Sequence, residues 1–348
     1  MRTSLLTEIT GLSSENDLEK IKGNINKIIS EVSSSKQKDF IVSENGSSSS
    51  VNKNFLLNEL NQIKHSRTLG RTQYYIKRLI RGLTKNKTSK LNDINLNRWK
   101  EYDDIITDSL WIIEKRDKSG VHKADYWGNF IPQIPNQLMR RYTKKGDWIL
   151  DPFAGSGTTL IECKRLGRNG MGIELIPIVA KRAKENLSDE KNPFEIKTTL
   201  KTGDSTSIDF KTQLDKEKIK SFQFFLFHPP YWDIIKFSKR KNDLSNAKSI
   251  NDFIKMFGGV ADRTYPLLDK GRYCAVVIGD KYSSGEWIPL GFYVMQEMIK
   301  IGYKLKSTIV KNFDTTKGKM SQKELWRYRA LAGGFYIFKH EYIFLFQK

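Results

Sequence analysis

Short apolar runs that alternate with helical segments restrict this chain, from Trp148 onward, to one class of fold. The runs WILDPF, GMGIEL, FQFFLF and RYCAVVIG each end at a turn signal, as buried parallel strands do. The segments between them, such as TTLIECKRLG, IPIVAKRAKENL and PLGFYVMQEMIKIG, carry apolar residues at helical spacing. This alternation predicts an α/β fold with a doubly wound, mostly parallel sheet.

A glycine-rich turn follows the first of these strands. The run DPFAGSGTT comes directly after WIL and opens the helical segment TTLIECKRLG. Glycines let the backbone turn sharply and approach a ligand, and a helix N-terminus offers free N–H groups. The run lacks the Gly-Lys-Ser/Thr ending of a nucleotide-triphosphate loop. The predicted cofactor-binding residues of this turn are Asp151, Pro152, Phe153, Ala154, Gly155, Ser156, Gly157, Thr158 and Thr159.

Two acidic residues stand where later strands are expected to end. Glu174 closes the run GMGIE, the place at which dinucleotide folds carry a carboxylate for ribose hydroxyls. Asp204, in GDST, follows the next expected strand and is predicted to face an adenine ring. Either acid alone is also compatible with an ordinary loop or cap residue.

A rigid aromatic turn follows the apolar strand FFLF. His228, Pro229, Pro230, Tyr231 and Trp232 come in direct succession. Two prolines at the end of a strand stiffen the turn and fix where the carbonyls and the next aromatic ring point. A polar group, two prolines and an aromatic ring make a clamp for a flat base.

Taken together and in this order, DPFAGSGTT, GIE, GDST and HPPYW resemble the DNA amino-methyltransferase family, which methylates adenine N6 or cytosine N4 with S-adenosylmethionine. The resemblance covers roughly residues 122–348. It implies a Rossmann-like, seven-stranded sheet with a reversed last strand, and the run GGFYIFKHEYIFLFQK matches that strand. It also implies that the segment GNFIPQIPNQLMRRY lines the cofactor pocket, with Asn129 and Phe130 as its predicted contacts beside Gly128 and Pro132.

The resemblance further implies a catalytic role for His228, Pro229, Pro230 and Tyr231. An exocyclic amine is a poor nucleophile, so acceptors must localise its lone pair, and the Pro229 carbonyl is one of them. Relatives usually carry Asp, Asn or Ser at the other acceptor position, where this chain has His228. A neutral imidazole accepts a hydrogen bond and an imidazolium does not, so activity is expected to fall in acid. Tyr231 is predicted to stack on a base flipped out of duplex DNA.

A formal net charge of +21 favours an anionic partner, and nucleic acid fits it best. The segment from Lys53 to Lys90 holds ten lysines and arginines and one acidic residue, Glu59. Its alternative role is a solvated helix whose Tyr and Leu residues pack on the catalytic domain. The predicted nucleic-acid contacts are Lys77, Arg78 and Arg81 in a helix near residues 72–83, Trp232 after the proline pair, and Arg327 and Arg329 in a basic loop.

Four segments are expected along the chain. Helical spacing predicts an N-terminal helical segment over residues 1–32, and the Ser- and Asn-rich stretch 33–52 reads as a flexible linker. Residues 53–120 form a basic helical region for nucleic acid, and residues 121–348 form the methyltransferase domain. Target recognition is assigned to the N-terminal helices and to the loops after Tyr231 and Phe313.

Several classes of protein are excluded or left open by composition. No apolar stretch of about 18 residues predicts a membrane span, and the first residues lack a signal pattern, so we expect a cytoplasmic protein. The composition, rich in Lys, Asn and Ile, indicates a microbial or phage source. The two cysteines, Cys163 and Cys274, lie far apart, which predicts no metal site and no disulfide. An RNA base-amine methyltransferase and a catalytically silent nucleic-acid-binding protein remain alternatives. Adenine against cytosine, the recognition sequence, a solitary or restriction-system role and the oligomeric state remain open.

Overall fold

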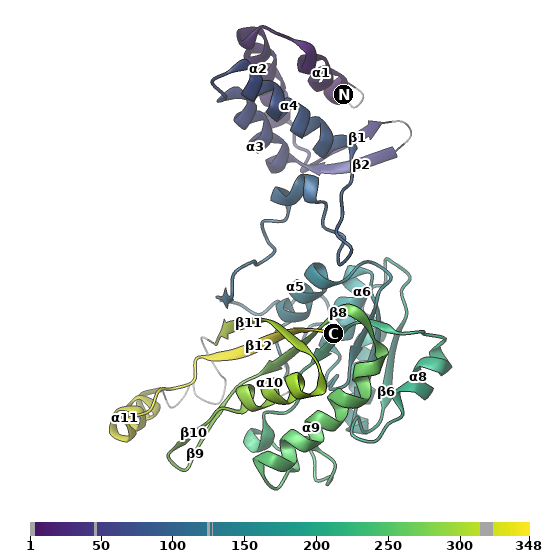
Figure 1. Cartoon of the computed structure of the whole chain (residues 1–348), viewed down its shortest axis with the longest axis vertical. Helices are drawn as coiled ribbons and strands as arrows, with labels where there is room; N and C mark the ends of the chain where they lie inside the picture. The colour runs from purple at the N-terminus through teal and green to yellow at the C-terminus, as the bar shows by residue number, and fades with distance from the viewer. Residues whose placement is uncertain (1–3, 45–46, 124–125, 127, 314–322) are drawn as a thin grey trace. The chain divides into compact units, whose positions relative to one another are not determined.

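The computed structural model describes residues 4–44, 47–123, 126, 128–313 and 323–348, and it divides the chain into two compact units (Figure 1). The first unit runs from Met1 to Ile105 and the second from Ile106 to Lys348. Residues 106–120 therefore belong with the sheet rather than with the basic region, because the short strand β3 (Leu110–Trp111) pairs with β11 (Lys304–Asn312) in the second unit.

Helices and one strand pair build the first unit around a single apolar core. Its elements are α1 (Ser4–Gly11), η1 (Leu12–Ser14), α2 (Leu18–Ser34), β1 (Asp39–Glu44), β2 (Ser47–Asn52), α3 (Lys53–Lys64), α4 (Leu69–Thr84) and η2 (Leu96–Glu101). The core takes Ile21 and Ile25 from α2, Leu60 from α3 and Leu79 from α4. Asp17, Asn52 and Thr68 accept backbone N–H bonds at the starts of α2, α3 and α4.

The expected flexible linker over residues 33–52 is wrong, because the structure has the antiparallel pair β1 and β2 there. Phe40, Val42 and Val51 are buried in the core of the first unit. Phe40 and Val42 are apolar residues two positions apart, which is the period of a strand. The many serines near them favoured the interpretation as a linker.

The second unit is an eight-stranded sheet with helices on both faces. In chain order its other strands are β4 (Trp148–Asp151), β5 (Asn169–Glu174), β6 (Thr198–Thr202), β7 (Phe222–Phe227), β8 (Leu268–Ile278) and β12 (His340–Gln347), and the order across the sheet is β3-β11-β12-β8-β7-β4-β5-β6. Only β12 runs antiparallel to its neighbours β11 and β8 among the described strands of this sheet. The doubly wound sheet and its reversed last strand are confirmed, and the expected count of seven strands is corrected to eight by β3.

The helices of this unit are α5 (Gln133–Tyr142), α6 (Thr158–Leu166), α7 (Pro177–Asp189), α8 (Phe210–Glu217), α9 (Ile250–Thr264), α10 (Leu290–Ile301) and α11 (Lys323–Gly333). Helices α5, α6 and α7 pack on one face of the sheet, and α8, α9 and α10 pack on the other (Figure 1). Leu138 and Leu160 lie in the cores of the first face, and Phe253 and Val294 in the core of the second. Short elements are η3 (Trp232–Ile234), η4 (Leu244–Asn246), η5 (Tyr265–Leu267), β9 (Lys281–Ser283) and β10 (Glu286–Ile288).

The strand order reverses between β4 and β7. From β4 the chain moves outward through β5 and β6, and then returns to place β7 on the other side of β4. Ligands of open α/β sheets bind in the crevice at such a switch point, beyond the carboxyl ends of the strands. The turns that leave β4 and β7 therefore meet at one edge of the sheet.

Among the described helices, none has the length and hydropathy of a membrane span.

Candidate active site

A cavity of about 990 Å³ opens at this edge of the sheet. It is bordered by the turns after β4 and β7, the end of β5, the loop after β6 and the segment before α5, with β11 and β12 at its far side. Small-molecule sites usually occupy about 300–1,000 Å³, so the cavity is large enough for a cofactor and part of a second ligand.

Asp151 holds the glycine-rich turn in shape from behind the cavity. Its side chain accepts hydrogen bonds from the Phe153 N–H at 2.9 Å and the Thr159 hydroxyl at 2.5 Å. Burial raises the pKa of Asp151 to about 7. Gly157, directly before α6, has a φ of +85°, a conformation that other residues rarely adopt. Of the residues predicted in this turn, Pro152, Phe153, Ala154, Gly155, Ser156 and Thr158 line the cavity, whereas Asp151, Gly157 and Thr159 lie outside its lining.

Glu174 lies at the end of β5 and lines the cavity beside this turn. One carboxylate oxygen accepts the Gly155 N–H at 2.9 Å, and the other accepts the Ile176 N–H at 2.8 Å. Burial raises the pKa of Glu174 despite these bonds. Because a carboxylate has about four acceptor positions, Glu174 keeps lone pairs for hydroxyl groups of a ligand.

Asp204 also lines the cavity, but its carboxylate is occupied by neighbouring side chains. It accepts hydrogen bonds from Thr206, Ser207 and, at 2.8 Å, the Asn242 amide. Burial acts to raise the pKa of Asp204, and the bonds from Asn242 and Thr206 outweigh it and lower the pKa. The Asp204 oxygens therefore already accept several hydrogen bonds from the protein, whereas the sequence predicted a carboxylate that faces an adenine ring.

The segment before α5 joins the two turns. The Thr158 hydroxyl donates to the Asn129 side-chain oxygen at 2.6 Å, and the Phe130 ring lies edge-on to the His228 ring with centroids 4.6 Å apart. Gly128 lines the cavity as well, and Pro132 precedes α5 outside the lining. The sequence-predicted residues Asn129 and Phe130 therefore contact both predicted halves of the site.

His228, Pro229, Pro230 and Tyr231 also line the cavity. The Tyr231 ring packs against the Gly279 backbone, where any Cβ atom would lie 3.0 Å from the ring. Its hydroxyl donates to Glu341 at 2.7 Å and lies 3.4 Å from the His228 Nε2. Burial, followed by the positive charge of Lys311, lowers the pKa of His228 to about 3. At neutral pH His228 is therefore an uncharged imidazole.

The predicted nucleic-acid contacts are not all at this site. Trp232 is outside the cavity lining, donates its indole N–H to the Ala247 carbonyl and carries Lys281 over its ring at 4.3 Å. The expected basic loop around residues 327–329 is wrong, since Arg327 and Arg329 are exposed on helix α11. The loop after Phe313 lies outside the described residues through residue 322.

On α4 of the first unit, the three predicted basic contacts differ in exposure. Lys77 and Arg81 are exposed. Arg78 bonds to Glu59 and Gln62, and Glu59, which is 3% exposed, also pairs with Lys100 at 2.6 Å. Arg78 therefore compensates a buried carboxylate inside the unit, and of the three predicted contacts only Lys77 and Arg81 face solvent.

Many cavity residues were not predicted from the sequence. They include Tyr126, Phe237, Asn242, Lys311 and Glu341. The first three stand in irregular loops without a motif. Lys311 and Glu341 offered a signal, because each is a charged residue beside a run of apolar strand residues, in STIVKNF and HEYIFLF.

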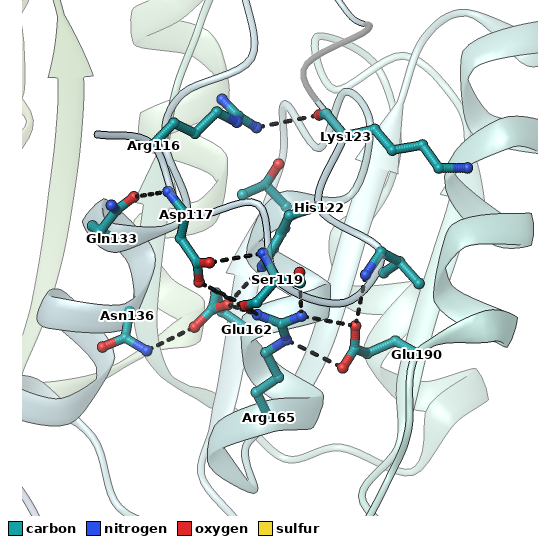
Figure 2. A network of polar contacts seen from close by, with 12 residues as sticks. Arg116, Asp117, Ser119, His122, Lys123, Gln133, Asn136, Glu162, Arg165 and Glu190 are labelled. Carbon is teal, nitrogen blue, oxygen red and sulfur yellow. Dashed lines mark hydrogen bonds and ion pairs between the residues drawn. The ribbon is translucent and has the colours of Figure 1, made fainter.

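A polar network holds the segment 116–123 onto α6 (Figure 2). Glu162, which is 1% exposed, accepts bonds from His122 at 2.7 Å and from Asn136 at 2.8 Å. Arg165 reaches Ser119 and Glu190 from the same helix. The network thereby connects the segment before the cavity to the helix that begins at the glycine-rich turn.

We expect Glu162→Gln to lower the free energy of unfolding by about 1–3 kcal/mol, because the amide nitrogen then faces donors and leaves a buried group unsatisfied. Urea unfolding of the purified chain measures this change. Glu185→Gln, an exposed position on α7, is the matched control and is expected to leave stability unchanged. Equal stability of the two variants would contradict the structural role of Glu162.

A family model and several curated proteins are similar to this chain. The family model N6_N4_Mtase, a DNA methylase, matches residues 13–185. The matched residues include the glycine-rich turn and Glu174 and end before His228. A Type II methyltransferase of Streptococcus pneumoniae, M2.DpnII, is 39% identical over 100 residues, which cover 27% of this chain and 34% of that protein. M.MjaII of Methanocaldococcus jannaschii is 47% identical over 58 residues, 17% of this chain and 11% of that one.

The similar stretches thus span at most about a third of the length of these curated relatives. Among solved structures, TrmN from Thermus thermophilus aligns with a TM-score of 0.40 at 14% identity, over 63% of this chain and 49% of that one. A methyltransferase from Pyrococcus furiosus aligns with a TM-score of 0.40 at 13% identity, over 65% and 87%.

Proposed function

Because the chain belongs to the DNA amino-methyltransferase family, whose cofactor is S-adenosylmethionine, we propose that it transfers a methyl group to the exocyclic amine of adenine (N6) or cytosine (N4) in DNA. One observation carries the proposal. The glycine-rich turn with Glu174 and the His228-to-Tyr231 turn border a single cavity at the switch point of the sheet.

The residues present fit this cofactor. Glu174 has acceptor capacity left for ribose hydroxyls, and Pro152 to Ser156 with Asn129 form the wall around it. S-adenosylmethionine supplies an electrophilic methyl group on a positively charged sulfur. The role of the polypeptide is then to hold the cofactor and to present the amine to that methyl group.

His228 and the Pro229 carbonyl act on the amine. The amine lone pair is delocalised into the base, and acceptors placed against its N–H groups favour the tetrahedral nitrogen that attacks. The neutral His228 ring supplies one acceptor and the Pro229 carbonyl supplies the other. Tyr231, fixed against Gly279, stacks on the flipped base and orients it.

The proposal is tested by incubating the protein with methyl-labelled S-adenosylmethionine and unmodified DNA or RNA, followed by mass spectrometry of the digested nucleosides. Label in N6-methyladenine or N4-methylcytosine of DNA supports the proposal and identifies the base. Label in RNA alone assigns the activity to RNA instead. Binding of DNA without any label would mean a silent nucleic-acid-binding protein.

His228 is expected to stay uncharged between pH 8 and pH 5, so its protonation should not lower kcat in this range. The pKa of His228 is about 3, far below the usual value near 6.5, so the acceptor is lost only as the pH approaches 3. Initial rates across this range at saturating cofactor and DNA measure the effect. A fall in kcat centred near pH 6.5 that disappears in His228→Asn would contradict a buried, neutral His228, whereas a fall shared by both proteins belongs to another group, such as Asp151 with its pKa of about 7.

The same shift links pH to stability. Between about pH 6.5 and pH 3 the unfolded chain binds a proton that the folded His228 does not. The contribution of His228 to the free energy of unfolding is therefore complete above about pH 6.5 and declines as the pH falls toward 3.

For the first unit we propose that Lys77 and Arg81 contact DNA phosphates. Replacing both by Gln is expected to weaken DNA binding and to reduce the slope of log K against log salt by about 2, since each phosphate contact contributes about 1. Fluorescence anisotropy at several salt concentrations measures the slope. Lys27→Gln, at an exposed position on α2, is the control. An unchanged slope in the double variant would place the DNA elsewhere.

A further inference from the structure

Four side chains form a continuous line of contacts at the wall of the cavity. Lys311 on β11 pairs with its cross-strand neighbour Glu341 on β12 at 3.1 Å. The other Glu341 oxygen accepts the Tyr231 hydroxyl at 2.7 Å, and that hydroxyl lies 3.4 Å from the Nε2 of His228. Lys311 and Glu341 border the cavity but are each only 5% exposed, so these two charges are largely shielded from water.

The chemistry of these groups determines which of them donates and which accepts each hydrogen bond. A carboxylate only accepts hydrogen bonds, so the single proton of the Tyr231 hydroxyl is directed to Glu341. Toward His228 the same oxygen has only lone pairs left. Its contact with the imidazole is therefore favourable when Nε2 carries the proton of the neutral ring.

We propose that Glu341, acting through Tyr231, is a positioning residue that selects the His228 tautomer with its proton on Nε2 and leaves Nδ1 as the acceptor for the substrate amine. The inference rests on the proposed function for its last step. Within the described residues no protein hydrogen bond to Nδ1 of His228 is present, and His228 lines the cavity. The edge-on Phe130 ring restrains the imidazole from the other side.

Lys311 is the cation beside Glu341. A buried carboxylate needs a cation or hydrogen-bond donors to offset the loss of water. Lys311 offsets the charge of Glu341 at one carboxylate oxygen, 3.1 Å away, and leaves the other oxygen to accept the Tyr231 hydroxyl.

The test observes the tautomer directly and requires no substrate. The full chain is labelled with ¹⁵N in its histidine rings, of which there are four, and the His228 signals are assigned as those missing in His228→Asn. We expect the wild type to show protonated Nε2 and unprotonated Nδ1. Tyr231→Phe, which keeps the ring and removes the hydroxyl, is expected to give a mixture of tautomers.

Activity provides the second readout. Tyr231→Phe is expected to lower kcat about 10- to 100-fold, the loss usual when a group that orients a functional histidine is removed, with little change in KM for DNA. The double variant Lys311→Met/Glu341→Leu, which removes the acceptor of the Tyr231 hydroxyl without leaving one buried charge unpaired, should shift the tautomer in the same way. Glu286→Gln, at an exposed position on β10, is the matched control for both readouts.

A wild-type His228 with its proton on Nδ1, or a tautomer unchanged in Tyr231→Phe, overturns the inference. If the double variant does not fold, the comparison of wild type with Tyr231→Phe decides alone. The expected tautomer in a chain that methylates neither DNA nor RNA would overturn the proposed function while leaving the link from Glu341 to His228 intact.

Discussion

His228→Ala is expected to lower kcat about 10²- to 10³-fold while leaving the Kd for S-adenosylmethionine unchanged. The variant removes an acceptor from the site at which charge develops on the amine, and loss of one such preorganised group typically has an effect of this size. Within the described residues no hydrogen bond or ring contact joins His228 to the glycine-rich turn, so the bonds of Glu174 to that turn stay intact and the variant can affect the cofactor only through Phe130. Single-turnover rates and calorimetric titration with the cofactor separate the two quantities.

His228→Asn is the matched variant. It restores a side-chain acceptor of the kind that the resemblance places at this position, and it is expected to recover much of the activity lost in His228→Ala. Two results would argue against the assigned role: an alanine variant with full activity, or an asparagine variant as inactive as alanine. The second would mean that the imidazole itself, and not merely an acceptor, is required.

Glu174→Gln is expected to weaken binding of S-adenosylmethionine about tenfold to a hundredfold. Hydrogen bonds to a charged group contribute about 1.5–3 kcal/mol, and each 1.4 kcal/mol corresponds to a factor of ten in Kd. The substitution also turns an amide group toward the N–H of Gly155 or Ile176, which disturbs the turn that Glu174 holds. Calorimetric titration of the purified variant with the cofactor measures the change.

Glu185→Gln provides the comparison, because it makes the same chemical change at an exposed position of α7. Cofactor affinity in this control should match the wild type. If Glu174→Gln binds the cofactor as tightly as Glu185→Gln does, the ribose is held by other groups, and the wall formed by Pro152 to Ser156 becomes the main binding surface.

The sequence allowed the sheet and the core of the site to be predicted because parallel strands impose where their ends lie. Turns that follow neighbouring strands must meet at one edge, so DPFAGSGTT and HPPYW, about 70 residues apart, were expected together. Asn129 and Phe130 were predicted only through the resemblance, and they contact Thr158 and His228. The roles of these residues stay predictions until the variants are measured.

The features that the sequence did not predict are of two kinds. Some depend on contacts between residues far apart in the chain, and one is a strand pair whose apolar pattern is obscured by serines. Lys311 and Glu341 become neighbours only because β12 enters the sheet in reverse beside β11, in a register that no local pattern encodes. The hairpin β1–β2 was read as a linker because its serines outweighed three buried apolar residues. Arg78 was assigned to DNA because a buried Glu59 partner cannot be recognised from charge density alone.

The network around Glu162 has a mechanical consequence. The backbone N–H groups of Asp117, Ser119 and Val121 all donate to side chains, those of Gln133, Asp117 and Glu190. These bonds belong to the same polar network that joins the segment to α6 (Figure 2). We therefore expect them to open together rather than one residue at a time. The segment then behaves as one cooperative unit of local unfolding, joined to the helix behind the glycine-rich turn. Amide hydrogens of segment 116–123 and of the part of α6 that it contacts should therefore exchange with solvent at a common rate.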